Sequence, residues 1–185
     1  SIFNPSSELS NNTSIFSDFT DTTGAKQAIA KSGYESDRLS LSILVNKDNQ
    51  NRVTAAKLIK TSLQSVGFKV SINRVSSKQY RKAIKKKNFD IYIGEIRLSD
   101  DMNLYPFLSK NGGARYGINM KSGCVKSYEK YLNGSSNLGK FVLDFNSDMP
   151  FIPVLYRQGM IAYSKSMHGD MQGGYQNCFS NIEDW

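Results

Sequence analysis

The chain has 185 residues, enough for one domain with its own core, and its 39% hydrophobic and 11% aromatic residues exclude wholesale disorder. No apolar run approaches the about 18 residues that a membrane span needs, and no basic start followed by an apolar stretch marks a signal peptide. The formal net charge of +8 raises the question of a nucleic-acid partner.

The first 60 residues change from a polar segment to regular structure. Residues 1–24 are dominated by Ser, Thr and Asn, which predicts an irregular, extended segment laid over a surface rather than a core element. Asp21 or Thr22 is expected to cap a short helix that stops at Gly33. The alternation of apolar and polar residues over Leu39–Val45 then predicts a half-buried strand.

Two further strands follow, each preceded by a helix. Asn51 is expected to cap a helix that ends before Gly67, and Phe68–Ile72 alternate as a second strand. Ser77 opens the next helix, and Phe89–Ile93 make the third strand. The order strand, helix, strand, helix, strand predicts an α/β fold with a βαβαβ core and a largely parallel sheet.

The rest of the chain is less regular. Two more helices are expected near Val125–Leu132 and over Asn137–Phe145. Phe151–Tyr156 resemble a strand with Gly159–Tyr163 as its partner, and residues 164–185 form a Gly-rich tail that looks unable to fold alone.

One basic run accounts for the net charge. Between Phe68 and Phe89 there are eight basic residues and no acidic residue. Lysines crowd the last turn of the helix that Ser77 opens, where they offset the negative end of the helix dipole. We therefore expect a solvated helix face, with binding of nucleic acid or another polyanion through Lys78–Lys87 as the alternative. The eight residues are Lys69, Arg74, Lys78, Arg81, Lys82, Lys85, Lys86 and Lys87.

Catalytic and metal-binding patterns are nearly absent. His168 is the only histidine and lies in the tail, so a Ser–His or Cys–His couple is not expected. No phosphate-binding glycine motif and no EF-hand pattern occurs. Cys124 and Cys178 show no CxxC spacing, and they either pair in an oxidising compartment or stay as two free thiols. The sequence therefore predicts no catalytic residue, no metal and no cofactor.

A cluster of charge follows the third strand. Glu95, Arg97, Asp100 and Asp101 occur within seven residues, and ligands of open α/β sheets collect outside the carboxyl ends of the strands. These four residues are therefore candidates for contact with a charged ligand. Two alternatives remain: the four pair among themselves and cap Leu104–Leu108, or two of the acids form a carboxylate pair for acid–base chemistry.

An ordered set of short motifs resembles one family. In chain order it consists of AKQAIAKSGY (25–34), VGFKV (66–70), FDIYIG (89–94), MPFIPV (149–154) and NIEDW (181–185). The set resembles family 5 of the bacterial extracellular solute-binding proteins, the peptide-binding components of ABC importers, and GEIRLSDDMNLYPFL looks like members from Gram-positive anaerobes. The resemblance implies a three-layer-like lobe with a mixed sheet, as in the second lobe of a type II periplasmic binding protein.

The resemblance also implies a domain organisation. Residues 1–24 would be a crossing segment, residues 25–163 the ligand-binding lobe, and residues 164–185 a tail that returns to a missing first lobe. It implies a non-enzymatic receptor that captures peptides or similar charged small solutes for an ABC transporter permease. Such a receptor sits at the extracellular face of the membrane, anchored by lipid, or in the periplasm, and nucleic acid is not an expected partner.

The sequence departs from the family at the expected ligand contact. Peptide-binding members typically follow the third strand with GW..D, whose Asp pairs with the α-ammonium of the peptide. Here Glu95 follows Gly94, and Leu98 stands where that Asp would fall. Asp100, Asp101 or Glu95 is the expected substitute. Together with the position after the third strand, the resemblance implies that Glu95, Arg97, Asp100 and Asp101 contact the ligand.

Overall fold

The chain forms two compact units. The computed structural model describes residues 2–10, 20–34, 39–157, 162–169, 171, 173 and 177–184. One unit comprises Ser17–Ile96 and is called the sheet unit; the other comprises Ser1–Phe16 with Arg97–Trp185 and is called the helical unit. Residues 25–163, predicted as a single lobe, include parts of both units.

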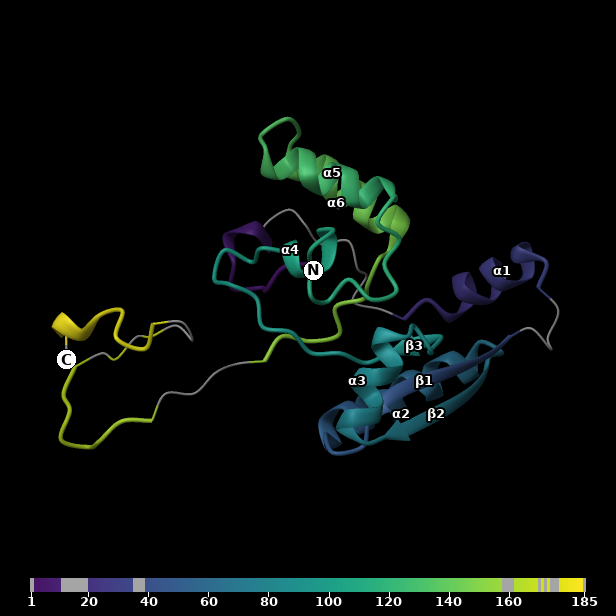
Figure 1. The fold of residues 1–185 in the computed structure, drawn as a ribbon, viewed down its shortest axis with the longest axis horizontal. Helices are drawn as coiled ribbons and strands as arrows, with labels where there is room; N and C mark the ends of the chain where they lie inside the picture. Colours follow the sequence, from purple (N-terminus) through teal and green to yellow (C-terminus); the bar gives the residue numbers. More distant parts are fainter. Residues whose placement is uncertain are drawn as a thin grey trace. The chain divides into compact units, whose positions relative to one another are not determined.

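The sheet unit contains a three-stranded parallel sheet (Figure 1). Its strands are β1 (Ser40–Asn46), β2 (Lys69–Val75) and β3 (Ile91–Tyr92), in the order β2-β1-β3. The three predicted strands are therefore neighbours in one sheet, and the α/β fold is confirmed. All strand pairs in the described residues are parallel, whereas a mixed sheet was expected.

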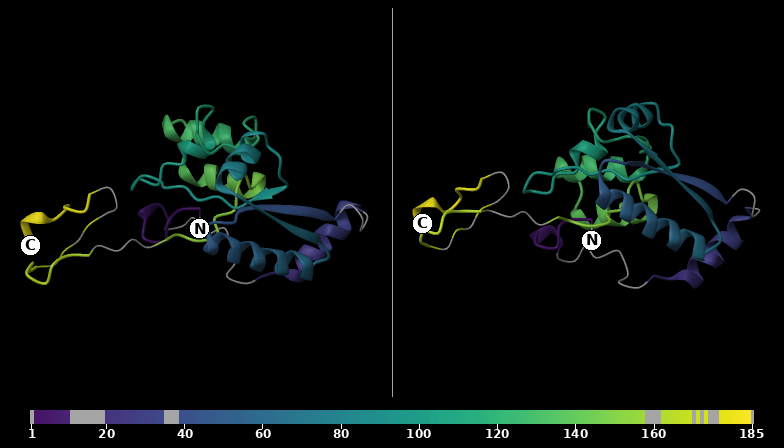
Figure 2. Two further views of the ribbon diagram at one scale, coloured as in Figure 1. Left: turned by 60° about the horizontal axis from the view of Figure 1, so that its bottom comes forward. Right: turned by 90° about the horizontal axis from the view of Figure 1, so that it is seen from below.

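Helices cover both faces of this sheet. Figure 2 shows α2 (Gln50–Ser65) and α3 (Ser77–Lys85) on opposite sides of the strands. Tyr80 and Ile84 of α3 are buried. The core beneath α2 consists of Ile43, Val45, Val53, Ala56 and Val70.

The helices of the sheet unit begin at side-chain caps. The first helix, α1 (Thr22–Ser32), has Asp21 as its N-cap and ends at Gly33 with φ +70°, as predicted. The cap of α2 is Asn49 instead of Asn51, because the Asn49 side chain accepts a hydrogen bond from the backbone N–H of Arg52. Ser76 caps α3 one residue before the predicted start.

The third strand is shorter than predicted. Phe89–Ile93 were expected, but only Ile91 and Tyr92 form ladder pairs. The Asp90 carboxylate accepts hydrogen bonds from both the backbone N–H and the hydroxyl of Ser42, each at 2.8 Å. The Asp90 side chain thus accepts from a backbone N–H of β1 that would otherwise donate to a backbone carbonyl of a longer third strand.

The helical unit is built around a pair of packed helices. These are α5 (Gly123–Leu132) and α6 (Leu138–Asp148), which lie side by side and match the two predicted helices (Figure 1). The shorter elements are η1 (Glu8–Ser10), α4 (Tyr105–Leu108) and η2 (Ile182–Asp184). The fully buried side chains of the core include Phe3, Leu104, Leu108, Val125, Cys124, Phe141 and Phe145.

Two predictions for this unit are wrong. Ile2 and Phe3 are only 1% and 2% exposed, so the polar first segment contributes to the core, because these apolar side chains pack into it. Residues 151–157 form no strand: Phe151 stacks on Phe107 with ring centroids 4.4 Å apart, and no backbone pairing partner is found among the described residues. Of the proposed partner, residues 159–161 lie outside the described part of the chain.

No helix in the described ranges combines the length and the apolar character that a bilayer crossing requires.

Candidate functional site

Glu95 lies just beyond the carboxyl end of β3 and is held by an arginine from α2. The Arg52 guanidinium donates to the Glu95 carboxylate at 3.0 Å, and the two side chains are 20% and 41% exposed. Arg52 is in the first turn of α2, which follows the carboxyl end of β1. Parallel strands bring these two ends to the same edge of the sheet, so the pair lies where ligands of α/β sheets collect.

Tyr80 fixes the chain immediately before Glu95. Its hydroxyl donates to the backbone carbonyl of Ile93 at 2.5 Å. Burial raises the pKa of Tyr80 to about 12, against a smaller opposing effect of the Arg52 guanidinium. The phenol therefore remains a neutral donor at physiological pH, and it anchors the end of β3.

Asp100 and Asp101 belong to the helical unit, and they have different surroundings. The Asp101 carboxylate accepts from the backbone N–H of Asn103 at 3.1 Å and from the hydroxyl of Ser99. The Asp100 carboxylate is exposed, and the described structure shows no hydrogen bond or ion pair for it. Asp101 therefore shapes the loop, whereas Asp100 is available to a ligand.

Tyr128 of α5 holds this loop in place. Its hydroxyl accepts from the backbone N–H of Leu104 at 2.7 Å and donates to the side-chain carbonyl of Asn103 at 2.9 Å. The Asn103 carbonyl also accepts from the N–H of Tyr105 and so bonds the start of α4. Burial raises the pKa of Tyr128 to about 12, so the phenol keeps its proton and can act as donor and acceptor at once.

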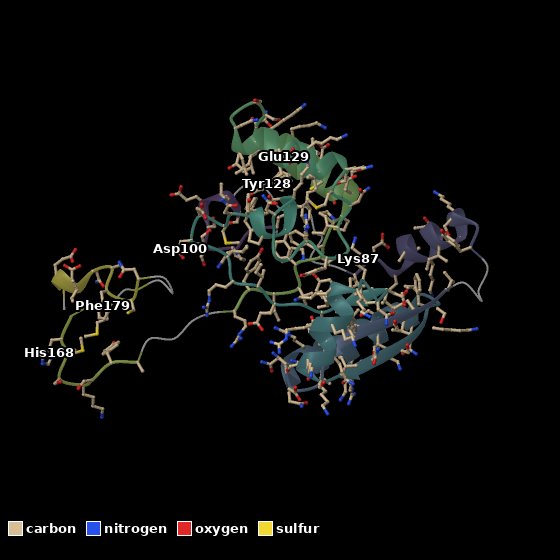
Figure 3. All side chains as sticks on the ribbon, viewed as in Figure 1. Lys87, Asp100, Tyr128, Glu129, His168 and Phe179 are labelled. Carbon is tan, nitrogen blue, oxygen red and sulfur yellow. The ribbon has the colours of Figure 1, made fainter. Side chains whose placement is uncertain are left out.

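The two aspartates line a hollow of about 520 Å³ in the helical unit. We call it the acidic hollow, because Glu8, Asp100 and Asp101 line it and no basic side chain does. Apart from the neutral polar residues Ser7 and Asn103, its other walls are apolar or aromatic and include Phe3, Tyr128 and Leu132. Figure 3 labels Asp100, Tyr128 and, outside the hollow on α5, Glu129.

The four predicted site residues are divided between the two units. Glu95 is the second-last residue of the sheet unit, and Arg97, which is exposed, is the first residue of the helical unit's second segment. The predicted capping of Leu104–Leu108 by these acids is not found: α4 has Leu104 as its N-cap without a side-chain cap hydrogen bond, and the N–H of Tyr105 donates to the Asn103 side chain instead.

Several residues that build these sites were not predicted from the sequence. Arg52 was not predicted as the partner of Glu95, because 43 positions separate them. Phe3 and Glu8 were not predicted beside Asp100, although an apolar pair within a polar segment is a signal for burial. Tyr128 was expected only as part of a helix.

The remaining candidates of the sequence analysis are also placed by the structure. Lys85, Lys86 and Lys87 are exposed. Cys124 is buried and Cys178 is exposed, and both are free thiols. Among the described residues there is no group of three or more His, Cys, Asp or Glu side chains arranged to hold a metal ion.

A parallel α/β unit and a loop with carboxylates over a hollow are features of a ligand-binding protein. Residues 1–115 match the family model for bacterial extracellular solute-binding proteins, family 5 Middle. The match covers more than half of the chain, so the chain belongs to this family, as its motifs indicated. A comparison with curated proteins found no match.

Membership establishes a role in binding solutes for transport, in a family of binding proteins and not of enzymes. It also implies a periplasmic or extracellular location. Three of the five motifs lie within the matched residues, and all four predicted site residues do as well. MPFIPV and NIEDW lie beyond residue 115 and remain a resemblance.

Proposed function

We propose that the chain is the ligand-binding lobe of an ABC importer's solute-binding protein and captures peptides or similar charged small solutes. Glu95, Arg97, Asp100 and Asp101 contact the solute, which lies between this lobe and a second lobe. The receptor delivers the solute to a transporter permease at the extracellular face of the membrane or in the periplasm.

The observation that carries this proposal is the exposed Asp100 carboxylate at the acidic hollow. A peptide brings an α-ammonium, and a charge that leaves water on binding loses several kcal/mol unless it finds a partner. Asp100 can supply that partner, since no side chain in the described structure neutralises it. The loop that carries it is fixed by Asp101 and Tyr128, which makes Asp100 a preorganised contact.

Glu95 offers a second carboxylate in a different setting. Its ion pair with Arg52 holds the side chain at the end of β3 without burying it, because the carboxylate stays 41% exposed. A solute that carries both charges can add its ammonium to Glu95. Arg97, also exposed, supplies a cation for the solute's carboxylate.

Calorimetric titration of the full-length receptor, which supplies the second lobe, with matched peptides tests the proposal. A set of di- to pentapeptides is first screened by the rise in melting temperature, and the tightest binder is titrated with a free and with an acetylated N-terminus. We expect acetylation to weaken binding at least tenfold, about 1.4 kcal/mol, because the ammonium is lost. Asp100→Asn should weaken the free peptide similarly and leave the acetylated peptide unaffected.

The control is Glu129→Gln, which removes one negative charge from an exposed position of α5 outside the hollow. It should change affinity by less than about twofold, ~0.4 kcal/mol. The same measurement is made on four variants of the site: Glu95→Gln, Arg97→Gln, Asp100→Asn and Asp101→Asn. If each of them also changes the affinity by less than about twofold, the charge cluster is structural and the proposed site is wrong. If no peptide in the set binds, the peptide class itself is wrong.

A further inference from the structure

The acidic hollow carries more negative charge than one ammonium can neutralise. Three carboxylates line it, from Glu8, Asp100 and Asp101, in a chain whose net charge is +8. Asp101 is engaged by its own loop, but neither Glu8 nor Asp100 makes a side-chain hydrogen bond or ion pair in the described part of the chain. Two carboxylates of one hollow are thus open to cations.

The walls of the hollow favour a hydrocarbon. Phe3 and Met102 line it and are buried, and the ring centroids of Tyr128 and Tyr131 on α5 lie 6.4 Å apart. Leu132 also lines the hollow and is 50% exposed, so an aliphatic chain lying on it would remove apolar surface from water. Aromatic faces additionally attract ammonium groups.

The volume of the acidic hollow and the electrostatic field of its carboxylates both agree with a small organic cation as ligand. A volume of about 520 Å³ lies within the usual range of small-molecule sites, roughly 300–1,000 Å³. A hollow whose charged side chains all have one sign, with largely apolar and aromatic walls between them, concentrates ions of the opposite sign. A metal ion would leave the apolar walls unused, whereas an organic cation uses both features.

We infer that the acidic hollow binds an aliphatic dication: two ammonium groups joined by a hydrocarbon chain, one at Asp100 and the other at Glu8. A linear diamine has this chemistry, and so does a peptide whose first residue is lysine. The inference rests on the proposed solute-binding function and deepens it by naming the class of solute.

The test compares the binding of three probes of equal chain length to the 185-residue chain: 1,5-diaminopentane, pentylamine and 1,5-pentanediol. Binding is followed by the shifts of backbone amide signals in NMR titrations at low salt. We expect the diamine to bind at least fivefold more tightly than the monoamine, and the diol not to bind. The shifts should centre on residues 7–9, 100–103 and 128–132.

Matched variants test whether Glu8 and Asp100 each bind one ammonium group of the diamine. Glu8→Gln should bring the affinity for the diamine to within about twofold of the monoamine, because the second ammonium loses its partner. Asp100→Asn should do the same, and Glu129→Gln should preserve the fivefold preference. All three side chains lie at the surface, so the fold is checked simply by comparing amide spectra without probe.

Equal binding of diamine and monoamine, or a preference that survives Glu8→Gln, would overturn the inference. The outcome is separable from that of the proposed function. If the affinity for peptides depends on Glu95 and Asp100 but the affinity for the diamine does not depend on Glu8, only the dication site is wrong. If the diamine binds as expected and no peptide does, the dication site stands and the peptide class is wrong.

Discussion

Removing the Tyr128 hydroxyl should loosen the loop that carries Asp100 and Asp101. In Tyr128→Phe the backbone N–H of Leu104 loses its acceptor at 2.7 Å, and Leu104 is only 1% exposed, so water cannot replace it. An unsatisfied buried donor costs about 1–3 kcal/mol. The ring itself is retained, and its contact with Phe141, at a centroid distance of 5.1 Å, is unchanged. We expect a loss of about 2 kcal/mol in the free energy of unfolding.

Differential scanning calorimetry measures this effect. A loss of about 2 kcal/mol lowers the melting temperature of a protein of this size by roughly 4–8 °C. The control is Tyr131→Phe, because the Tyr131 hydroxyl makes no hydrogen bond in the described structure. It should shift melting by less than about 1 °C. If the two variants melt together, Tyr128 does not hold the loop, and the argument that Asp100 is preorganised fails.

Three further predictions concern thiols, lysines and the ion pair at the sheet edge. Burial, with Asp148 and Asp144 adding to it, raises the pKa of the Cys124 thiol from 9.0 to about 12, so the folded state keeps a proton that the unfolded state loses. The free energy of unfolding, measured with urea, should therefore fall as pH rises from about 9 towards 12, and Cys124→Ala should reduce that fall. Because Cys124 is buried and Cys178 is exposed, a thiol reagent at pH 8 should modify Cys178 alone. Replacing residues 85–87 by Ala should change stability by less than about 0.5 kcal/mol per exposed lysine; oligonucleotide binding near micromolar at physiological salt, abolished by this variant, would contradict the solvated-face interpretation. Arg52→Gln should cost only about 1 kcal/mol in urea unfolding, since Glu95 is 41% exposed, and a loss above ~3 kcal/mol would mean that the pair is effectively buried.

The local signals of the sequence predicted the sheet unit well. Alternating residues identified all three strands, and Asp21 and Gly33 marked both ends of α1 because caps act within a few residues. The start of α2 was placed two residues late, since Asn49 and Asn51 are equally good caps by residue type. Only the geometry of the chain after β1 selects Asn49.

What the sequence could not predict depends on contacts between distant residues. Residues 151–156 have the composition of a strand, but a strand needs a pairing partner, and the described structure provides none. The acidic hollow similarly joins Glu8, Asp100 and Leu132, which are far apart in the chain. The charged residues after the third strand indicated two carboxylates of the hollow, those of Asp100 and Asp101. No rule of sequence spacing could predict that Glu8, from the first segment of the chain, lines the same hollow.

The most direct test of the account is a crystal structure of the protein with the tightest-binding peptide. We predict that the peptide's α-ammonium lies within hydrogen-bonding distance, about 2.7–3.2 Å, of a carboxylate oxygen of Asp100, Asp101 or Glu95. A bound peptide whose ammonium contacts none of these three carboxylates would contradict the proposed site.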